Sequence, residues 1–119
     1  MSPERSAISV AKGSRLRPNQ DFAGALERFC RDQGITRARI HGGVGSTIGA
    51  SFVDGRCVEP FATELTVTSG MLAPVAGGET EAQLDVALVD YTGGLAEGRL
   101  MRGDNPVLMT MELVHEVIA

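Results

Sequence analysis

With 119 residues, the chain has the size of one domain and can bury a hydrophobic core without disulfides or a structural metal. Hydrophobic residues make up 43% of it, but aromatic residues only 4%, which argues against a surface that stacks nucleic-acid bases. The formal net charge of -4 argues against nucleic acid as a partner, because contacts to phosphates need clustered Lys and Arg.

The two cysteines, Cys30 and Cys57, are too few to indicate a zinc site or a disulfide framework. We therefore expect reduced thiols and a cytoplasmic protein. No apolar run approaches the roughly 18 residues of a membrane span. Residues 1–17 lack the apolar core of a signal peptide. Residues 1–6 are predicted to be a disordered N-terminal lead-in, and residues 7–119 to be a single domain.

One helix is predicted between Asn19, which can cap its first turn, and Gly34, which can end it in a left-handed conformation. Asp21 suits the positive end of the helix dipole. Apolar residues recur at helical spacing on the face expected to pack on a sheet: Phe22, Ala25, Leu26, Phe29 and Cys30. Charged residues are expected on the opposite, solvent side: Glu27, Arg28, Arg31 and Asp32.

The remaining sequence alternates as β-strands do. Strands are expected in these early segments: residues 7–10, 36–40, 46–53, 58–61 and 64–69. A turn is expected at Asp54-Gly55. A later strand places Leu84, Val86 and Leu88 on one face and Gln83, Asp85 and Ala87 on the other. The final strand places these residues on one face, where its methionines are expected to pack in the core or at an interface: Val107, Met109, Met111, Leu113 and Val117. One helix with a meander of strands predicts an α+β domain, with a mainly antiparallel β-sheet packed against one principal helix.

A glycine-rich run lies between two of these strands. Gly43, Gly45 and Ser46 are predicted to form a structural turn or a close approach of chains at a subunit boundary. The run superficially resembles a dinucleotide-binding loop, but its last glycine is one position late and a strand pattern follows it.

Several short motifs occur along the chain in a defined order. They are DFAGAL at residues 21–26, GVGS at 43–46, ELTVTSG at 64–70, GRL at 98–100 with Gly103, and TME at 110–112. Together they resemble the PPC domain (plants and prokaryotes conserved domain) over nearly the whole chain. The resemblance implies a mostly antiparallel sheet and self-association as a homotrimer. In plants this domain accompanies DNA-binding AT-hooks, whereas stand-alone prokaryotic members have no settled activity.

The resemblance also locates a site. Many members carry a His-x-His pair on one strand and a third His in the segment that matches GRL, and the three suit a metal. The matching positions here hold Gln83, Asp85 and Arg99. Glutamine is a poor zinc ligand and the fixed charge of arginine repels a cation, so we expect no metal and no cofactor.

Arg99 is instead expected to replace the charge of the metal and to pair with Asp85, Glu64 or Glu112, although independent solvation of these groups is the alternative. The candidate inter-subunit pocket is thus lined by Gln83, Asp85, Arg99, Glu64 and Glu112. A guanidinium in such a pocket favours a small anionic ligand with a carboxylate or phosphate group.

Three functions stay open. The first is a binding or interaction module. The second is an enzyme with Glu64 or Glu112 as its acid–base group, which requires a pocket that raises the pKa of that carboxyl. The third is a catalytically silent partner of a metal-binding paralogue. No catalytic residue is assigned, since His41 and His115 have no cysteine or carboxylate at ligand spacing.

Overall fold

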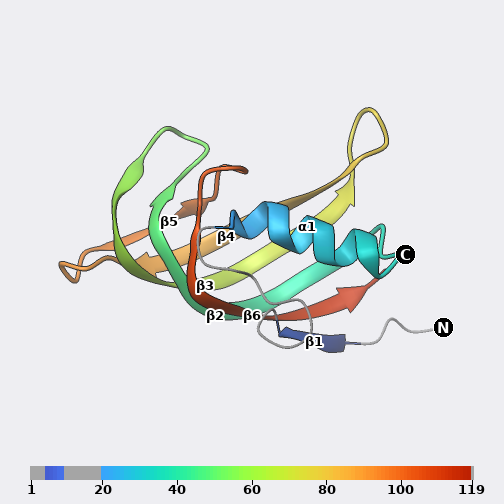
Figure 1. The fold of residues 1–119 in the computed structure, drawn as a ribbon, viewed down its shortest axis with the longest axis horizontal. Helices are drawn as coiled ribbons and strands as arrows, with labels where there is room; N and C mark the ends of the chain where they lie inside the picture. The colour runs from blue at the N-terminus through green and yellow to red at the C-terminus, as the bar shows by residue number, and fades with distance from the viewer. Residues whose placement is uncertain (1–4, 10–19, 119) are drawn as a thin grey trace.

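The computed structural model describes residues 5–9 and 20–118. Its strands form one six-stranded sheet in the order β1-β6-β2-β3-β4-β5, and every neighbouring pair is antiparallel. The strands are β1 (Arg5–Ser9), β2 (Ala38–Ser51), β3 (Cys57–Pro74), β4 (Thr80–Val89), β5 (Leu95–Arg99) and β6 (Val107–Val117). Within the described part of the chain there is one helix, α1 (Phe22–Asp32), which packs on one face of the sheet (Figure 1). The predicted α+β class is confirmed.

The helix begins at Asp21, whose side chain accepts a hydrogen bond from the backbone N–H of Gly24 at 2.9 Å. Asn19, the predicted cap, lies outside the described residues. Gly34 follows the last turn with φ of 71°, as predicted. No helix in residues 20–118 combines the length and apolar character that crossing a bilayer requires.

The predicted apolar face of α1 is buried against the sheet. Phe22, Leu26 and Cys30 are fully inaccessible, and Phe29 packs at the edge of the same core. The inner faces of the strands supply the rest of this core, including Ile40, Leu65, Val67, Leu72, Leu84, Val86, Met111 and Leu113. Burial raises the pKa of the Cys30 thiol to about 11, so this thiol stays protonated at neutral pH.

Glu27 departs from the prediction, because it is buried rather than exposed to solvent. Its oxygens accept hydrogen bonds from Nε of Arg102 at 2.6 Å and Nη2 at 2.7 Å, and from the backbone N–H of Ala82 at 2.8 Å. Nη1 of Arg102 also lies 3.3 Å from Oε2 of Glu81. Helical spacing could not reveal this burial, since the loop that follows β5 brings Arg102 over the helix from far along the chain.

The glycine-rich run lies inside β2, and the predicted turn at Gly43, Gly45 and Ser46 does not form. A Cβ on Gly43 would lie 2.4 Å from Cδ2 of Leu113 and 2.5 Å from the carbonyl oxygen of Glu112. The glycine therefore permits close approach of β6 to β2 within one chain. The single strand β2 therefore replaces the two strands predicted at 36–40 and 46–53. In the same way, β3 replaces the two predicted at 58–61 and 64–69.

At the other edge of the sheet, β1 starts earlier than predicted. Arg5 and Ser6, which were assigned to a disordered lead-in, pair with Glu116 and His115 of β6. The ladder extends to these residues because β6 continues as a strand to Val117.

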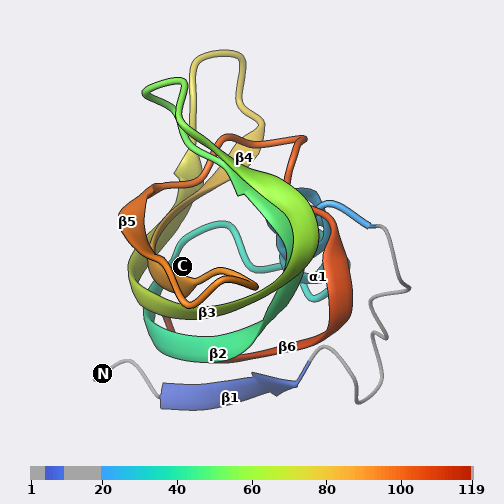
Figure 2. The same ribbon diagram turned by 90° about the vertical axis from the view of Figure 1, so that its left-hand side faces the viewer.

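The turn between β2 and β3 folds over the edge strand β5. Phe52 forms a bridge with Leu100, and the backbone N–H of Val53 donates to the carbonyl oxygen of Arg99 at 2.9 Å. Nη2 of Arg56 donates to the carbonyl oxygen of Glu97 at 2.8 Å. These bonds cover the edge of β5, and Figure 2 shows how strongly β2 and β3 curve to reach it.

The close contact at Gly43 generates a stability prediction. Gly43→Ala should lower the free energy of unfolding by roughly 1–3 kcal/mol, the usual cost of overpacking. Gly42→Ala is the matched control, because the nearest atom to its added Cβ is a carbonyl oxygen at 3.6 Å. Urea denaturation of both variants measures the difference. Equal stability of the two would contradict the proposed role of Gly43.

Candidate functional site

The side chains at the matched metal positions lie together on the outer face of the sheet, opposite α1. On β4, Leu84 and Val86 are buried, so Gln83 and Asp85 point outward, as predicted. Asp85 is the register partner of Arg99 on β5. Directly opposed residues of antiparallel strands have neighbouring side chains, so the register itself brings these groups into contact.

Arg99 and Asp85 form the predicted ion pair. Nε of Arg99 lies 3.0 Å from Oδ1 of Asp85 and Nη2 lies 3.3 Å from Oδ2, while Nη1 donates to Oε1 of Gln83 at 3.3 Å. The hydroxyl of Ser69 donates to the same carboxylate at 3.2 Å.

The pair changes the titration of both groups. Hydrogen bonds from Arg99 are the main reason that the pKa of Asp85 lies below its usual value, and Asp85 in turn raises the pKa of Arg99. The side chain of Asp85 is 36% exposed, and that of Arg99 is 47% exposed. An ion pair this accessible to water contributes less than about 1 kcal/mol to stability. Its consequence is therefore geometric: it holds both groups in place.

A second set of residues completes this region. Arg39 of β2 is the register partner of Met71 of β3, which in turn pairs with Gln83 of β4. A depression of about 390 Å³ opens here, which we call the polar depression. It is lined by Arg39, Ile40, His41, Thr68, Ser69, Gly70, Met71, Gln83, Asp85 and Arg99.

His41 has a carboxylate partner that sequence spacing did not reveal. Its Nε2 lies 2.7 Å from Oε1 of Glu116, and both side chains are largely buried. Glu116 is also the register partner of Arg39 across β2 and β6. Of this pair, His41 lines the polar depression and Glu116 does not.

The other two residues of the predicted pocket, Glu64 and Glu112, do not line the polar depression. Glu64 is five positions from Ser69 along β3, a separation of about 17 Å in an extended strand. Glu112 lies exposed on β6 as the register partner of Val44. Within one chain, the five predicted residues therefore do not line one pocket.

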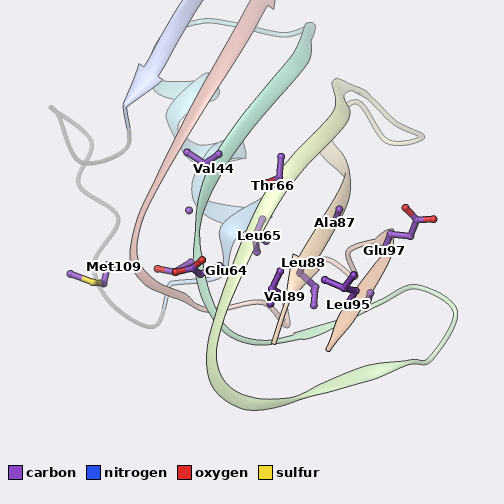
Figure 3. A pocket seen from close by; sticks show the side chains of 13 residues that line it. Val44, Glu64, Leu65, Thr66, Ala87, Leu88, Val89, Leu95, Glu97 and Met109 are labelled. Atoms are coloured by element: carbon purple, nitrogen blue, oxygen red, sulfur yellow. The ribbon is translucent and has the colours of Figure 1, made fainter. Parts of the chain in front are cut away.

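Glu64 belongs to a second, larger hollow on the same outer face, which we call the apolar groove. Its volume is about 860 Å³ and its lining residues are Val44, Gly45, Ser46, Glu64, Leu65, Thr66, Ala87, Leu88, Val89, Leu95, Ala96, Glu97 and Met109. Figure 3 shows Met109 and Glu64 at one side and Leu95 and Glu97 at the other. Leu95 is 80% exposed and Met109 is 72% exposed, although the strand pattern placed Met109 on the same face as Met111, which is buried.

Comparison with known proteins identifies the family of the chain. A sequence model of the Plants and Prokaryotes Conserved (PCC) domain matches residues 13–118. The chain belongs to this family. No curated protein matches the sequence of this PCC-domain chain.

Solved structures share the fold of the PCC-domain chain. A hypothetical protein from Salmonella cholerae-suis is 22% identical, with a TM-score of 0.70, over 99% of this chain and 80% of its own. A plant- and prokaryote-conserved protein from Pyrococcus horikoshii is 17% identical, with a TM-score of 0.72, over 100% and 82%. A metal-containing protein from Archaeoglobus fulgidus is 16% identical, with a TM-score of 0.71, over 100% and 82%. At these identities the similarity shows the fold alone.

The residues of this PCC-domain chain do not fit a metal at the matched positions. Both oxygens of Asp85 already accept hydrogen bonds from Arg99, and Gln83 directs its amide oxygen toward the same guanidinium. The positive charge of Arg99 would repel a cation at the only carboxylate of the polar depression. Among residues 5–9 and 20–118, no group of three or more His, Cys, Asp or Glu side chains could hold a metal ion.

The two arginine–carboxylate contacts should differ in their contribution to stability. Arg102→Met leaves the buried Glu27 without its charged partner and should lower the free energy of unfolding by roughly 1–3 kcal/mol or more. Arg99→Met removes an exposed pair and should cost less than about 1 kcal/mol. Urea denaturation at pH 7 measures both variants. A larger loss for Arg99→Met than for Arg102→Met would contradict this assignment.

Proposed function

We propose that this chain is a homotrimeric binding module that holds a small anionic ligand in the polar depression. The observation that carries the proposal is the set of charges there, because two guanidinium groups, Arg39 and Arg99, face a single carboxylate, Asp85. Guanidinium groups bind carboxylates and phosphates through paired hydrogen bonds. The amide of Gln83 and the hydroxyl of Ser69 add neutral polar groups.

The apolar groove supports self-association. Val44 is 58% exposed, and the exposure of Leu95 and Met109 is greater still. Large contiguous apolar hollows on a protein surface are typical of interaction sites. The apolar groove and the polar depression lie side by side on the outer face. Ala87 of β4 and Glu97 of β5 line the groove, and Asp85 and Arg99, two positions along the same strands, line the depression. A neighbouring subunit on the groove would therefore border the ligand site, as an inter-subunit pocket requires.

The other functions have less support. Glu64 and Glu112 are both exposed, and neither lies with the guanidinium groups. The enzymatic alternative therefore lacks an enclosed acid–base group. The net charge of -4 continues to argue against nucleic acid, and the free thiols of Cys30 and Cys57 agree with a cytoplasmic location.

Anion binding predicts a local response in solution. Titration of ¹⁵N-labelled protein with propionate or inorganic phosphate should shift the backbone amide resonances of residues 39–41, 69–71, 83–85 and 99. The double variant Arg39→Ala/Arg99→Ala should lose these shifts while keeping the dispersed spectrum of a folded protein. Shifts that survive in the double variant, or no shift with any anion, would contradict the proposed function.

Self-association predicts a mass of three chains by light scattering coupled to size-exclusion chromatography. The double variant Leu95→Glu/Met109→Glu should yield monomers, because it places two charges in the apolar groove. Val53→Glu is the control, because Val53 is 58% exposed but lies outside that groove. A monomeric wild-type protein, or a trimer that persists in the double variant, would contradict this part of the proposal.

A further inference from the structure

We infer that Arg39, rather than Arg99, receives the charged group of the ligand, and that the ligand is a small monocarboxylate. The inference rests on the proposed anion-binding function and names its ligand class and principal contact. Arg99 is then a positioning residue, which with Asp85 forms one wall of the polar depression.

Arg99 already uses three of its five guanidinium N–H groups, and its charge is paired with Asp85. Each of its three guanidinium nitrogens donates to a neighbour on β4, two of them to Asp85 and one to Gln83. A ligand carboxylate at Arg99 would have to displace Asp85, which the register of β4 and β5 holds directly opposite. The exchange would replace one bidentate pair by another and would leave Asp85 with only Ser69 as its side-chain donor.

Arg39 is in the opposite situation. Its side chain is exposed and lines the polar depression, and it makes no hydrogen bond or ion pair within the described part of the chain. Its neighbour Glu116 already bonds His41. Arg39 therefore presents its planar group of donors to the polar depression without first losing a partner.

The charge of the polar depression favours a single negative charge on the ligand. Its charged lining groups are Arg39, Arg99 and Asp85, an excess of one positive charge, whereas the nearby Glu116 is held by His41 and is not among the lining residues. A monocarboxylate neutralises this excess, whereas a phosphate dianion would add a second negative charge close to Asp85. Like charges in a partly enclosed site repel each other.

The floor of the polar depression suits the remainder of such a molecule. Met71 lies between Arg39 and Gln83 in the cross-strand row, and it is only partly exposed. A methionine side chain adapts to small apolar groups. The ligand class is therefore a short carboxylic acid, with its carboxylate on Arg39 and its apolar part over Met71.

Comparison of single variants by NMR titration with propionate and inorganic phosphate tests this inference. Arg39→Ala should weaken propionate binding by about tenfold or more, the loss expected for a charge-assisted bidentate contact. Arg37→Ala removes the same charge from an exposed residue outside the polar depression and should leave the affinity within about twofold. Asp85→Asn releases Arg99, so it should strengthen phosphate binding more than propionate binding.

The outcomes separate the inference from the function on which it rests. Loss of binding in Arg99→Ala with full binding in Arg39→Ala would overturn the inference and leave anion binding intact. Tighter binding of phosphate than of propionate to the wild-type protein would overturn the ligand class. If neither anion binds to the wild-type protein, the proposed function fails and the inference fails with it. A dispersed amide spectrum of Arg39→Ala establishes that a loss of affinity is not a loss of folding.

Discussion

The antiparallel register of β4 and β5 is the constraint on which the candidate site depends. It places Asp85 directly opposite Arg99, and the burial of Leu84 and Val86 fixes which face of β4 turns outward. A slip by one residue would move these apolar side chains to solvent, so the core specifies the register strongly. The turn at Phe52 then holds β5 in place, because Val53 bonds the carbonyl group of Arg99.

The same register decides which side chains meet on the outer face of β4 and β5. Two outward positions on β4 and one opposite them on β5 form a triangle that could hold a cation if all three were ligands. Here one corner carries a permanent positive charge, and the ion pair neutralises Asp85 without an external ion. The scaffold therefore supplies a fixed arrangement of side chains, whereas the residue types decide whether a metal or an organic anion is the complementary partner.

Local sequence patterns predicted those parts of the molecule that depend on near neighbours. The helical spacing of Phe22, Leu26 and Cys30 gave the helix and its buried face, and strand alternation gave the outward direction of Asp85. The resemblance to a family, rather than any spacing, connected Arg99 with Asp85. Contacts across the sheet were missed. Gly43 was interpreted as part of a turn or of a close approach between subunits, because nothing near it in the chain shows that β6 of the same chain passes against it.

Arg39 and His41 were missed for a related reason. Each lies on a strand that is alternately polar and apolar, a pattern that describes any half-exposed strand. Their positions beside the candidate site follow only from the order of strands, in which β3 separates β2 from β4. That order also puts the apolar groove next to the polar depression on one face. If a second subunit covers the groove, water is excluded from one border of the polar depression, and the attraction between Arg39 and a carboxylate becomes stronger there. Assembly and ligand affinity would then be coupled through this shared face.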